Sequence, residues 1–240
     1  MTPLEWLDSA EIDIEGRMPW SSNATFLCNL SVEGALVGQA IYKPLRGERP
    51  LWDFEPGLHR RELAAYWLSV AMGLDLVPPT VLRDGPLGEG SLQWFVEADH
   101  QQHYFTIYEN RPDLHDALRP FAFFDFIANN TDRKSGHVLI DADDHLWGID
   151  HGLCFAEEFK LRTVVWEFGG EQIPDDLVAI AARIAHAPPL DVATLLSDDE
   201  VEAMQHRAQF LVEHPVFPVD QSGRRYPLSL IHISEPTRPY

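Results

Sequence analysis

The chain has 240 residues, of which 45% are hydrophobic and 11% aromatic, a composition typical of a folded globular protein. Its formal net charge of −20 makes nucleic acid and anionic lipid surfaces unfavourable partners, because like charges repel. Its two cysteines, Cys28 and Cys154, are too few and too far apart to predict a disulfide framework or a zinc knuckle.

The N-terminal residues 1–16 are acidic and lack the basic and apolar segments of a secretory leader. The sequence also has no run of about 18 apolar residues, the length that a transmembrane helix requires. We therefore expect a cytoplasmic protein that does not insert into a membrane, and we expect both cysteines to be buried and unreactive.

The first hundred residues predict an antiparallel sheet with one helix. Residues 23–45 (NATFLCNLSVEGALVGQAIYKPL) have the composition of two strands joined by a turn at Glu33-Gly34. Residues 59–73 carry apolar side chains at helical spacing and end in a glycine, which is favoured where a helix ends. Two further strands are expected at about 80–84 and 91–97.

After a polar stretch the pattern becomes mainly helical. We expect an aromatic-rich helix at about 119–129 with its phenylalanines in the core, a hairpin at 137–150, a helix over PDDLVAIAARIAHA (174–187), and a helix capped by Ser197 and Glu200. This order predicts an α+β fold of two lobes with a cleft between them. The expected domains are a sheet-rich N-lobe (1–96) and a helix-rich C-lobe (97–227).

The last residues, LSLIHISEPTRPY (228–240), resemble read-through of a sequencing-library adapter. We therefore expect this tail to be non-native and exclude it from the fold. Its charges, Glu235 and Arg238, cancel, so the acidic character of the chain does not depend on the tail.

A cluster of polar and charged residues follows the aromatic helix. Phosphoryl transfer requires a carboxylate near the attacking hydroxyl and ligands for the magnesium ion that bridges the phosphates, and Asp132, His137 and Asp150 provide such groups. In protein kinases a metal-binding asparagine follows the catalytic aspartate by five residues, and His137 occupies that position here. Lys134 is placed to neutralise charge that develops on the transferred group.

Several short motifs occur in order along most of the chain. They are YKP (42–44), RGERPLWDF (46–54), REL-AAY (61–66), VPPTVLRDGP (77–86), NN-DRK-GH (129–137), DHG (150–152) and KLRT (160–163). With these motifs the chain resembles small bacterial proteins related to the phosphatidylinositol 3- and 4-kinase catalytic domain. The resemblance implies a bilobal protein-kinase-like fold, a phosphotransferase activity, and ATP with Mg²⁺ or Mn²⁺ as cofactors.

The resemblance also implies a role for individual residues. Lys43 would contact the α and β phosphates and pair with Glu62 in the helix that follows. Asp132 would be the catalytic aspartate and Asp150 the magnesium ligand, with His137 as a second metal ligand.

The rest of the nucleotide site is expected in two segments of the N-lobe. The loop SSNATF (21–26) occupies the place of the phosphate-covering turn, where backbone N–H groups and small hydroxyls can bind oxygens. Its expected ligand-binding residues are Ser22, Asn23 and Thr25. The adenine is expected at the hinge between the lobes, near Trp94 to Glu97, beside Phe95 and Glu97.

Two departures from the family pattern leave alternatives open. His137 stands where eukaryotic kinases carry asparagine, and a neutral imidazole is a less typical magnesium ligand than an amide oxygen. Lys134 replaces the histidine of the lipid kinases. The chain is therefore an active phosphotransferase, a nucleotide-binding pseudokinase with a regulatory role, or an enzyme that transfers AMP. Its acceptor is expected to be a protein or small molecule rather than a lipid, because no basic membrane-facing patch is visible.

Overall fold

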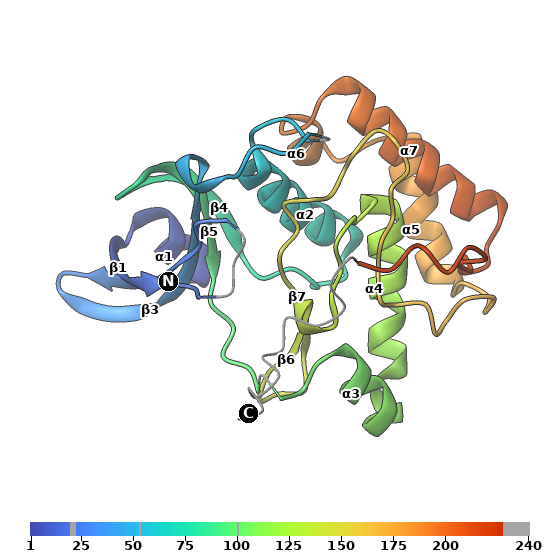
Figure 1. Ribbon diagram of the computed structural model, residues 1–240, viewed down its shortest axis with the longest axis horizontal. Coiled ribbons are helices and arrows are strands. Elements are labelled where there is room, and N and C mark those ends of the chain that lie inside the picture. The colour runs from blue at the N-terminus through green and yellow to red at the C-terminus, as the bar shows by residue number, and fades with distance from the viewer. Residues whose placement is uncertain (20–22, 53, 100, 228–240) are drawn as a thin grey trace, which may run out of the picture.

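The computed structural model describes residues 1–19, 23–52, 54–99 and 101–227, which form a sheet lobe and a helical lobe side by side (Figure 1). The main sheet has five antiparallel strands in the order β1-β2-β3-β5-β4, and a separate ribbon pairs β6 with β7. The strands are β1 (Glu11–Arg17), β2 (Phe26–Val32), β3 (Ala35–Pro44), β4 (Thr80–Gly85), β5 (Gly88–Trp94), β6 (Val138–Ile140) and β7 (Leu146–Gly148). The expected α+β fold, with an antiparallel-sheet lobe and a helix-rich lobe, is confirmed.

The helices lie mainly in the second lobe. They are α1 (Pro3–Ser9), α2 (Leu58–Met72), α3 (Tyr104–Asn110), α4 (His115–Ala128), α5 (Asp175–His186), α6 (Leu190–Ala193) and α7 (Asp198–Glu213). The capping box expected at Ser197 and Glu200 opens α7, and Gly73 ends α2 in the left-handed region at φ 70°.

The two faces of the main sheet have different partners. Strand residues alternate between the faces, so Tyr42 and Leu92 pack with α1 in one apolar core, while Lys43 faces the opposite way, toward α2. Trp94 stacks on Trp6 of α1 with ring centroids 5.8 Å apart. The sheet thus separates a structural face, covered by α1, from the face that carries Lys43.

Helix α2 is built into the core of the helical lobe. Its buried residues Ala64, Leu68 and Met72 belong to the same hydrophobic cluster as Phe121 and Phe124 of α4, whereas the sheet and α1 form a separate cluster. In Figure 1, α2 lies between the sheet and the other helices. Helix α2 therefore belongs to the expected N-lobe (1–96) by its place in the sequence, but it packs mainly against the helical lobe.

Some elements were not expected from the sequence. The sheet lobe has a second helix, α1, and an edge strand, β1, and the helical lobe begins with α3. Helix α1 was not predicted because it is short, with seven residues of which Leu7 alone is buried, so it has no long apolar stripe. The local signal for it is the Thr2–Glu5 capping box at its start. Helix α4 starts four residues before the expected 119, and its phenylalanines are in the core as expected.

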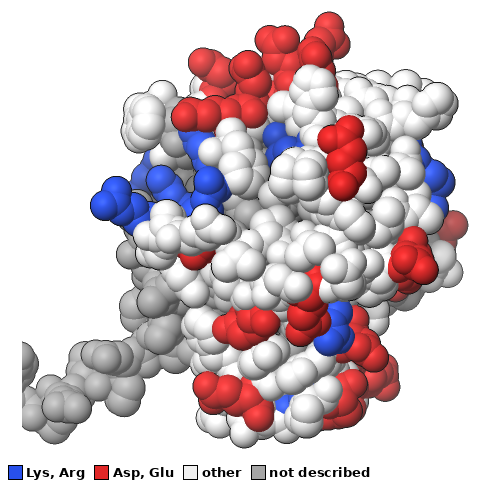
Figure 2. Space-filling view, turned by 90° about the vertical axis from the view of Figure 1, so that its right-hand side faces the viewer, with Lys and Arg blue, Asp and Glu red and all other residues white. Residues whose placement is uncertain are grey.

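The surface and the cysteines agree with the composition. Cys28 and Cys154 are both buried and not disulfide-bonded, which confirms the expected burial, and this burial raises the pKa of both thiols. None of the described helices has the length and apolar character to cross a membrane. Figure 2 shows that on the face of the helical lobe the charges are unevenly spread, with acidic side chains at the top and across the lower half and basic ones mainly at the upper left.

Candidate functional site

A buried arginine organises the loop that follows α4. The guanidinium of Arg133 is fully buried and donates to Asp125, with Nη2 2.8 Å from Oδ1, and to the carbonyls of His137 and Ile149. Its Nη2 also lies 2.8 Å from Nε2 of His151. Because one charged group contacts three segments of chain, it fixes the loop at 130–137 relative to the segment at 149–151.

Asp125 completes this network from the α4 side. Its carboxylate also accepts hydrogen bonds from the Asn130 amide at 3.0 Å and the Thr163 hydroxyl at 2.9 Å. All its side-chain partners lie outside α4, so the local sequence pattern does not predict its role. The available signal was a single carboxylate in the otherwise apolar run FAFFDFIA, because a charge buried in a helix requires a partner.

Lys43 bridges the two lobes. Its ammonium nitrogen lies 2.5 Å from Glu62 Oε1 and 2.7 Å from Asp150 Oδ1. The pairing with Glu62 is the one expected from the sequence, and the contact with Asp150 adds the end of the β6–β7 segment. Strand β3, helix α2 and the DHG triplet thus meet at one ammonium group.

Glu62 is held from both sides. It is 3% exposed, and its two carboxylate oxygens accept the backbone N–H groups of His151 and Gly152 at 3.0 Å. Asp150 has a left-handed backbone with φ 62°, a conformation that aspartate tolerates better than most residues. This bend lets the chain present two consecutive N–H groups to Glu62 while the Asp150 side chain reaches Lys43.

Electrostatics strengthen this arrangement. The charge of Lys43 holds the pKa of Asp150 well below its ordinary range, against the opposing effect of burial. Burial acts to lower the pKa of Lys43, but the charges of Asp150 and Glu62 outweigh it and raise that pKa. Lys43 and Asp150 therefore form an ammonium–carboxylate pair that stays ionised at neutral pH.

The second charged pair lies on the loop itself. Lys134 Nζ is 2.7 Å from Asp132 Oδ2, and the Asp132 backbone N–H donates to the Asn130 side chain at 3.0 Å. Asp132 lines the same cavity as Lys43 and Asp150. The two residues assigned to catalysis from the sequence are thus in contact, and Asp132 faces the charges of the N-lobe.

His137 is placed beside Asp150, with Nε2 3.5 Å from Oδ2. Burial lowers its pKa to about 3, so the ring is neutral at physiological pH. Nδ1 faces the backbone N–H of Lys134 at 3.4 Å, which favours the tautomer with its proton on Nε2, directed at Asp150. In this tautomer Nε2 carries the proton, so binding a metal through Nε2 requires the other tautomer.

The loop before β2 forms part of the cavity wall. The Ala24 N–H donates to the Gly47 carbonyl at 3.0 Å, and Asn23 Oδ1 accepts the Arg49 N–H at 3.0 Å. A Cβ on Gly47 would lie 2.6 Å from that of Ala24, so only glycine allows this close approach. Asn23 and Thr25 line the cavity with Lys43; Ser22, the third residue expected here, lies outside the described residues.

The enclosed space suits small charged groups. The cavity around Lys43, Asp132 and Asp150 measures about 50 Å³, which is room for a metal ion and a few oxygen atoms. In the described part of the chain, no group of three or more His, Cys, Asp or Glu residues is arranged to hold a metal. Magnesium commonly takes one or two protein carboxylates and completes its shell with phosphate oxygens and water.

The hinge residues are further away. The Phe95 N–H donates to the Gln39 carbonyl at 3.0 Å, and Glu97 is exposed; neither lines the cavity around Lys43. The Trp94 ring packs on the α1 face of the sheet, opposite to Lys43. The structure thus brings the expected phosphate and metal residues together but does not bring the expected adenine residues to them.

Known proteins share this sequence pattern and architecture. Residues 83–186 match the family model described as phosphatidylinositol 3- and 4-kinase. The chain is 37% identical over 258 aligned positions to Protein Rv2133c of Mycobacterium tuberculosis, covering 92% of each protein. The chain belongs to this phosphatidylinositol 3- and 4-kinase-related, kinase-like family.

Solved structures of atypical kinases have the same fold. The Golgi casein kinase with Mn/ADP bound gives a TM-score of 0.57 at 14% identity, over 92% of this chain and 76% of that one. The hydra Fam20 structure with sugar gives 0.56 at 15% identity, over 88% and 87%. The Helicobacter pylori proinflammatory kinase CtkA gives 0.50 at 14% identity, over 88% and 94%. The kinase-like fold expected from the sequence is thereby confirmed for this family member.

Proposed function

We propose that the protein is an ATP- and Mg²⁺-dependent phosphotransferase. The observation that carries this proposal is the position of Lys43, held between Glu62 and Asp150 in a cavity that Asp132 also lines. The kinase-like fold and the manganese and ADP bound to the related-fold Golgi casein kinase support it. The N-lobe (1–96) and C-lobe (97–227) would hold the nucleotide between them.

The charges of the cavity support a requirement for metal. Three carboxylates, those of Glu62, Asp132 and Asp150, stand against the ammonium groups of Lys43 and Lys134. A polyphosphate entering alone would meet a net negative site, which Coulomb repulsion disfavours. Asp150 would hold a magnesium ion, which would supply the missing positive charge when it is bound.

Each residue of the proposed nucleotide site then has a distinct role. Lys43 would bind phosphate oxygens while Glu62 keeps its ammonium in place, and Asn23 and Thr25 of the loop before β2 would cover the phosphates. Asp132 orients the acceptor hydroxyl and receives its proton, and Lys134 neutralises charge on the transferred group. Phe95 and Glu97 would contact the adenine once the nucleotide occupies the hinge.

His137 has two possible tasks, which the tautomer distinguishes. With its proton on Nε2 it orients Asp150 by a hydrogen bond; with its proton on Nδ1 it binds the metal directly. The first arrangement also favours a second candidate function, a pseudokinase that binds nucleotide without turning it over, because the position of the metal-binding asparagine is then not used for metal.

Binding and turnover are tested separately. Thermal shifts with ATP alone, ATP with Mg²⁺ and ATP with Mn²⁺ are expected to show stabilisation that depends on the metal. The Asp150→Asn variant is expected to lose that metal dependence. Asp132→Asn is expected to keep the thermal shift but lower the rate of ATP consumption about 10²- to 10⁴-fold. Asp116→Asn is the matched control, since this carboxylate is 98% exposed and far from the site.

The outcomes separate the candidate functions. An absent thermal shift with either metal contradicts any nucleotide-dependent function. Binding without ATP consumption, unchanged in Asp132→Asn, supports the pseudokinase. Mass spectrometry of proteins and small molecules after incubation with ATP distinguishes a phosphate adduct from an AMP adduct and identifies the acceptor, which we propose to be a protein or small molecule.

A further inference from the structure

A second and larger cavity lies in the helical lobe, away from the nucleotide site. It measures about 480 Å³, a size common among small-molecule sites. It is formed by α7, the end of α4, the segment at 157–166 and the C-terminal segment at 218–225. Its lining is mainly apolar and aromatic and includes Phe126, Phe159, Leu161, Trp166, Ala203 and Phe210.

Arg207 of α7 lines this cavity and is 7% exposed. Its Nε donates to the Ile127 carbonyl at 2.8 Å and its Nη1 to the Ala156 carbonyl at 3.4 Å. Its Nη2 is buried and has no hydrogen-bond partner within the described ranges. Burial lowers the pKa of Arg207 to about 10, and none of the described carboxylates raises it again.

The other buried arginines, unlike Arg207, are paired with carboxylates. Arg133 is paired with Asp125, and Arg61 of α2 is paired with Glu200 at the start of α7. A buried guanidinium without a counter-charge is costly, and proteins normally pair such groups with a carboxylate or bind an anion there. Arg207 therefore has an uncompensated charge in a side chain that lines the apolar cavity, and its unused donor Nη2 is buried behind that lining.

The rest of the charged lining agrees with an anionic ligand. Arg225 lies over the Phe159 ring, 4.8 Å from its centroid, and extends the positive charge on this side of the cavity. Glu157 is the one carboxylate among the residues that line it. A net positive lining is notable in a chain of net charge −20, where most surfaces repel anions.

We propose that this cavity binds a small organic carboxylate with an aromatic or branched apolar body. The carboxylate accepts from Arg207 at the inner wall, where a paired guanidinium and carboxylate form the strongest type of hydrogen bond in proteins. The apolar body packs among Phe126, Phe159 and Phe210. This site is separate from the cavity around Lys43 and does not depend on the proposed phosphotransferase activity.

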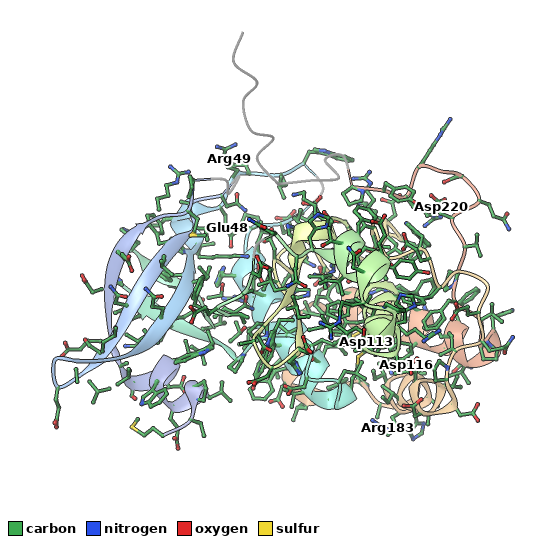
Figure 3. The ribbon with its side chains drawn as sticks, turned by 90° about the horizontal axis from the view of Figure 1, so that it is seen from below. Glu48, Arg49, Asp113, Asp116, Arg183 and Asp220 are labelled. Carbon is green, nitrogen blue, oxygen red and sulfur yellow. The ribbon has the colours of Figure 1, made fainter. Side chains whose placement is uncertain are left out.

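The test compares two probes with the same apolar body, one ending in a carboxylate and the other in a neutral amide. Isothermal titration of the full chain with 4-phenylbutyrate and with its neutral amide, 4-phenylbutanamide, is expected to show the carboxylate binding about tenfold more tightly or better. Arg207→Gln is expected to remove this preference. Arg183→Gln is the matched control, because Arg183, labelled in Figure 3, is an exposed residue of α5 that does not line this cavity.

A second variant leaves Arg207 in place. Ala203→Trp fills the cavity from α7 and is expected to abolish binding of both probes while the melting curve stays cooperative. The proposal is overturned by equal affinities for the acid and the amide, by no binding of the acid at about 10 mM, or by binding that survives in Ala203→Trp. Because Ala203→Trp and the pair of probes both test the intact guanidinium, the result does not depend on whether Arg207→Gln folds.

Discussion

Arg133 and Arg207 are both buried guanidinium groups, and their surroundings differ in one respect. Arg133 has Asp125, which fully compensates its charge and is itself held by Asn130 and Thr163. Arg207 has two backbone carbonyls and, among the described residues, no carboxylate. The compensated charge fixes the geometry of the candidate active site, whereas the uncompensated one leaves binding capacity for a ligand.

The largest expected effect comes from uncoupling the compensated pair. Asp125→Asn removes the negative charge but keeps the shape, so Arg133 becomes a buried charge without a partner. We expect the free energy of unfolding to fall by about 3–5 kcal/mol, measured by urea denaturation. Asp116→Asn on the exposed face of the same helix is the control and should change it by less than about 0.5 kcal/mol. A loss for Asp125→Asn as small as that of the control would contradict the assigned role of this pair.

A smaller effect is expected where α2 is joined to α7. Arg61 is paired with Glu200, which also completes the capping box of α7. Glu200→Ala removes both contacts, and we expect a loss of about 2 kcal/mol in the free energy of unfolding. The control is Glu202→Ala on the exposed side of α7, which should be nearly neutral. Equal losses for the two variants would show that the pair with Arg61 contributes nothing.

The variant Arg207→Met tests the uncompensated arginine. The variant loses two hydrogen bonds to backbone carbonyls but also removes an uncompensated buried charge, and these changes oppose each other. We expect a loss of about 1 kcal/mol or less by urea denaturation. A loss as large as that of Asp125→Asn would mean that Arg207 is compensated in a way that the described contacts do not include.

The smallest effect is a pH dependence at the start of α2. Burial acts to lower the pKa of His59, but its hydrogen bonds to Glu48 and Glu89 outweigh that and raise the pKa above the ordinary 6.5. The folded state then holds the proton more tightly than the unfolded state, so the stabilisation is complete below about pH 6.5 and is lost as the pH rises through the folded-state pKa. Melting temperatures measured across this range should decline less in His59→Gln than in the wild type.

The sequence was informative about local structure and about the order of the charged residues. The β2–β3 hairpin, helix α2 and the α7 cap all follow from alternation, helical spacing and capping residues close together in the chain. The spacing of Asp132, His137 and Asp150 likewise placed three groups of the site on adjacent segments, because a short hairpin connects them.

Features that depend on distant contacts could not be predicted. The partners of Asp125 come from the loop at 130–133 and from Thr163, and the surroundings of His137 include Asp150, thirteen residues further along the chain. The place of Trp94 on the α1 face was missed because α1 itself was not expected. In each case the deciding contact joins parts of the chain whose proximity is set by packing rather than by local pattern.

The attachment of α2 to the helical lobe has a consequence for local opening. Its apolar side chains belong to the core of that lobe, and Arg61 and Glu62 connect it to Cys154, His151 and Gly152. Cooperative units that open together share their buried contacts, and amide hydrogen exchange reports them. The amides of α2 should therefore exchange with deuterium in step with those of α4, while the strands of the five-stranded sheet form a unit that opens independently.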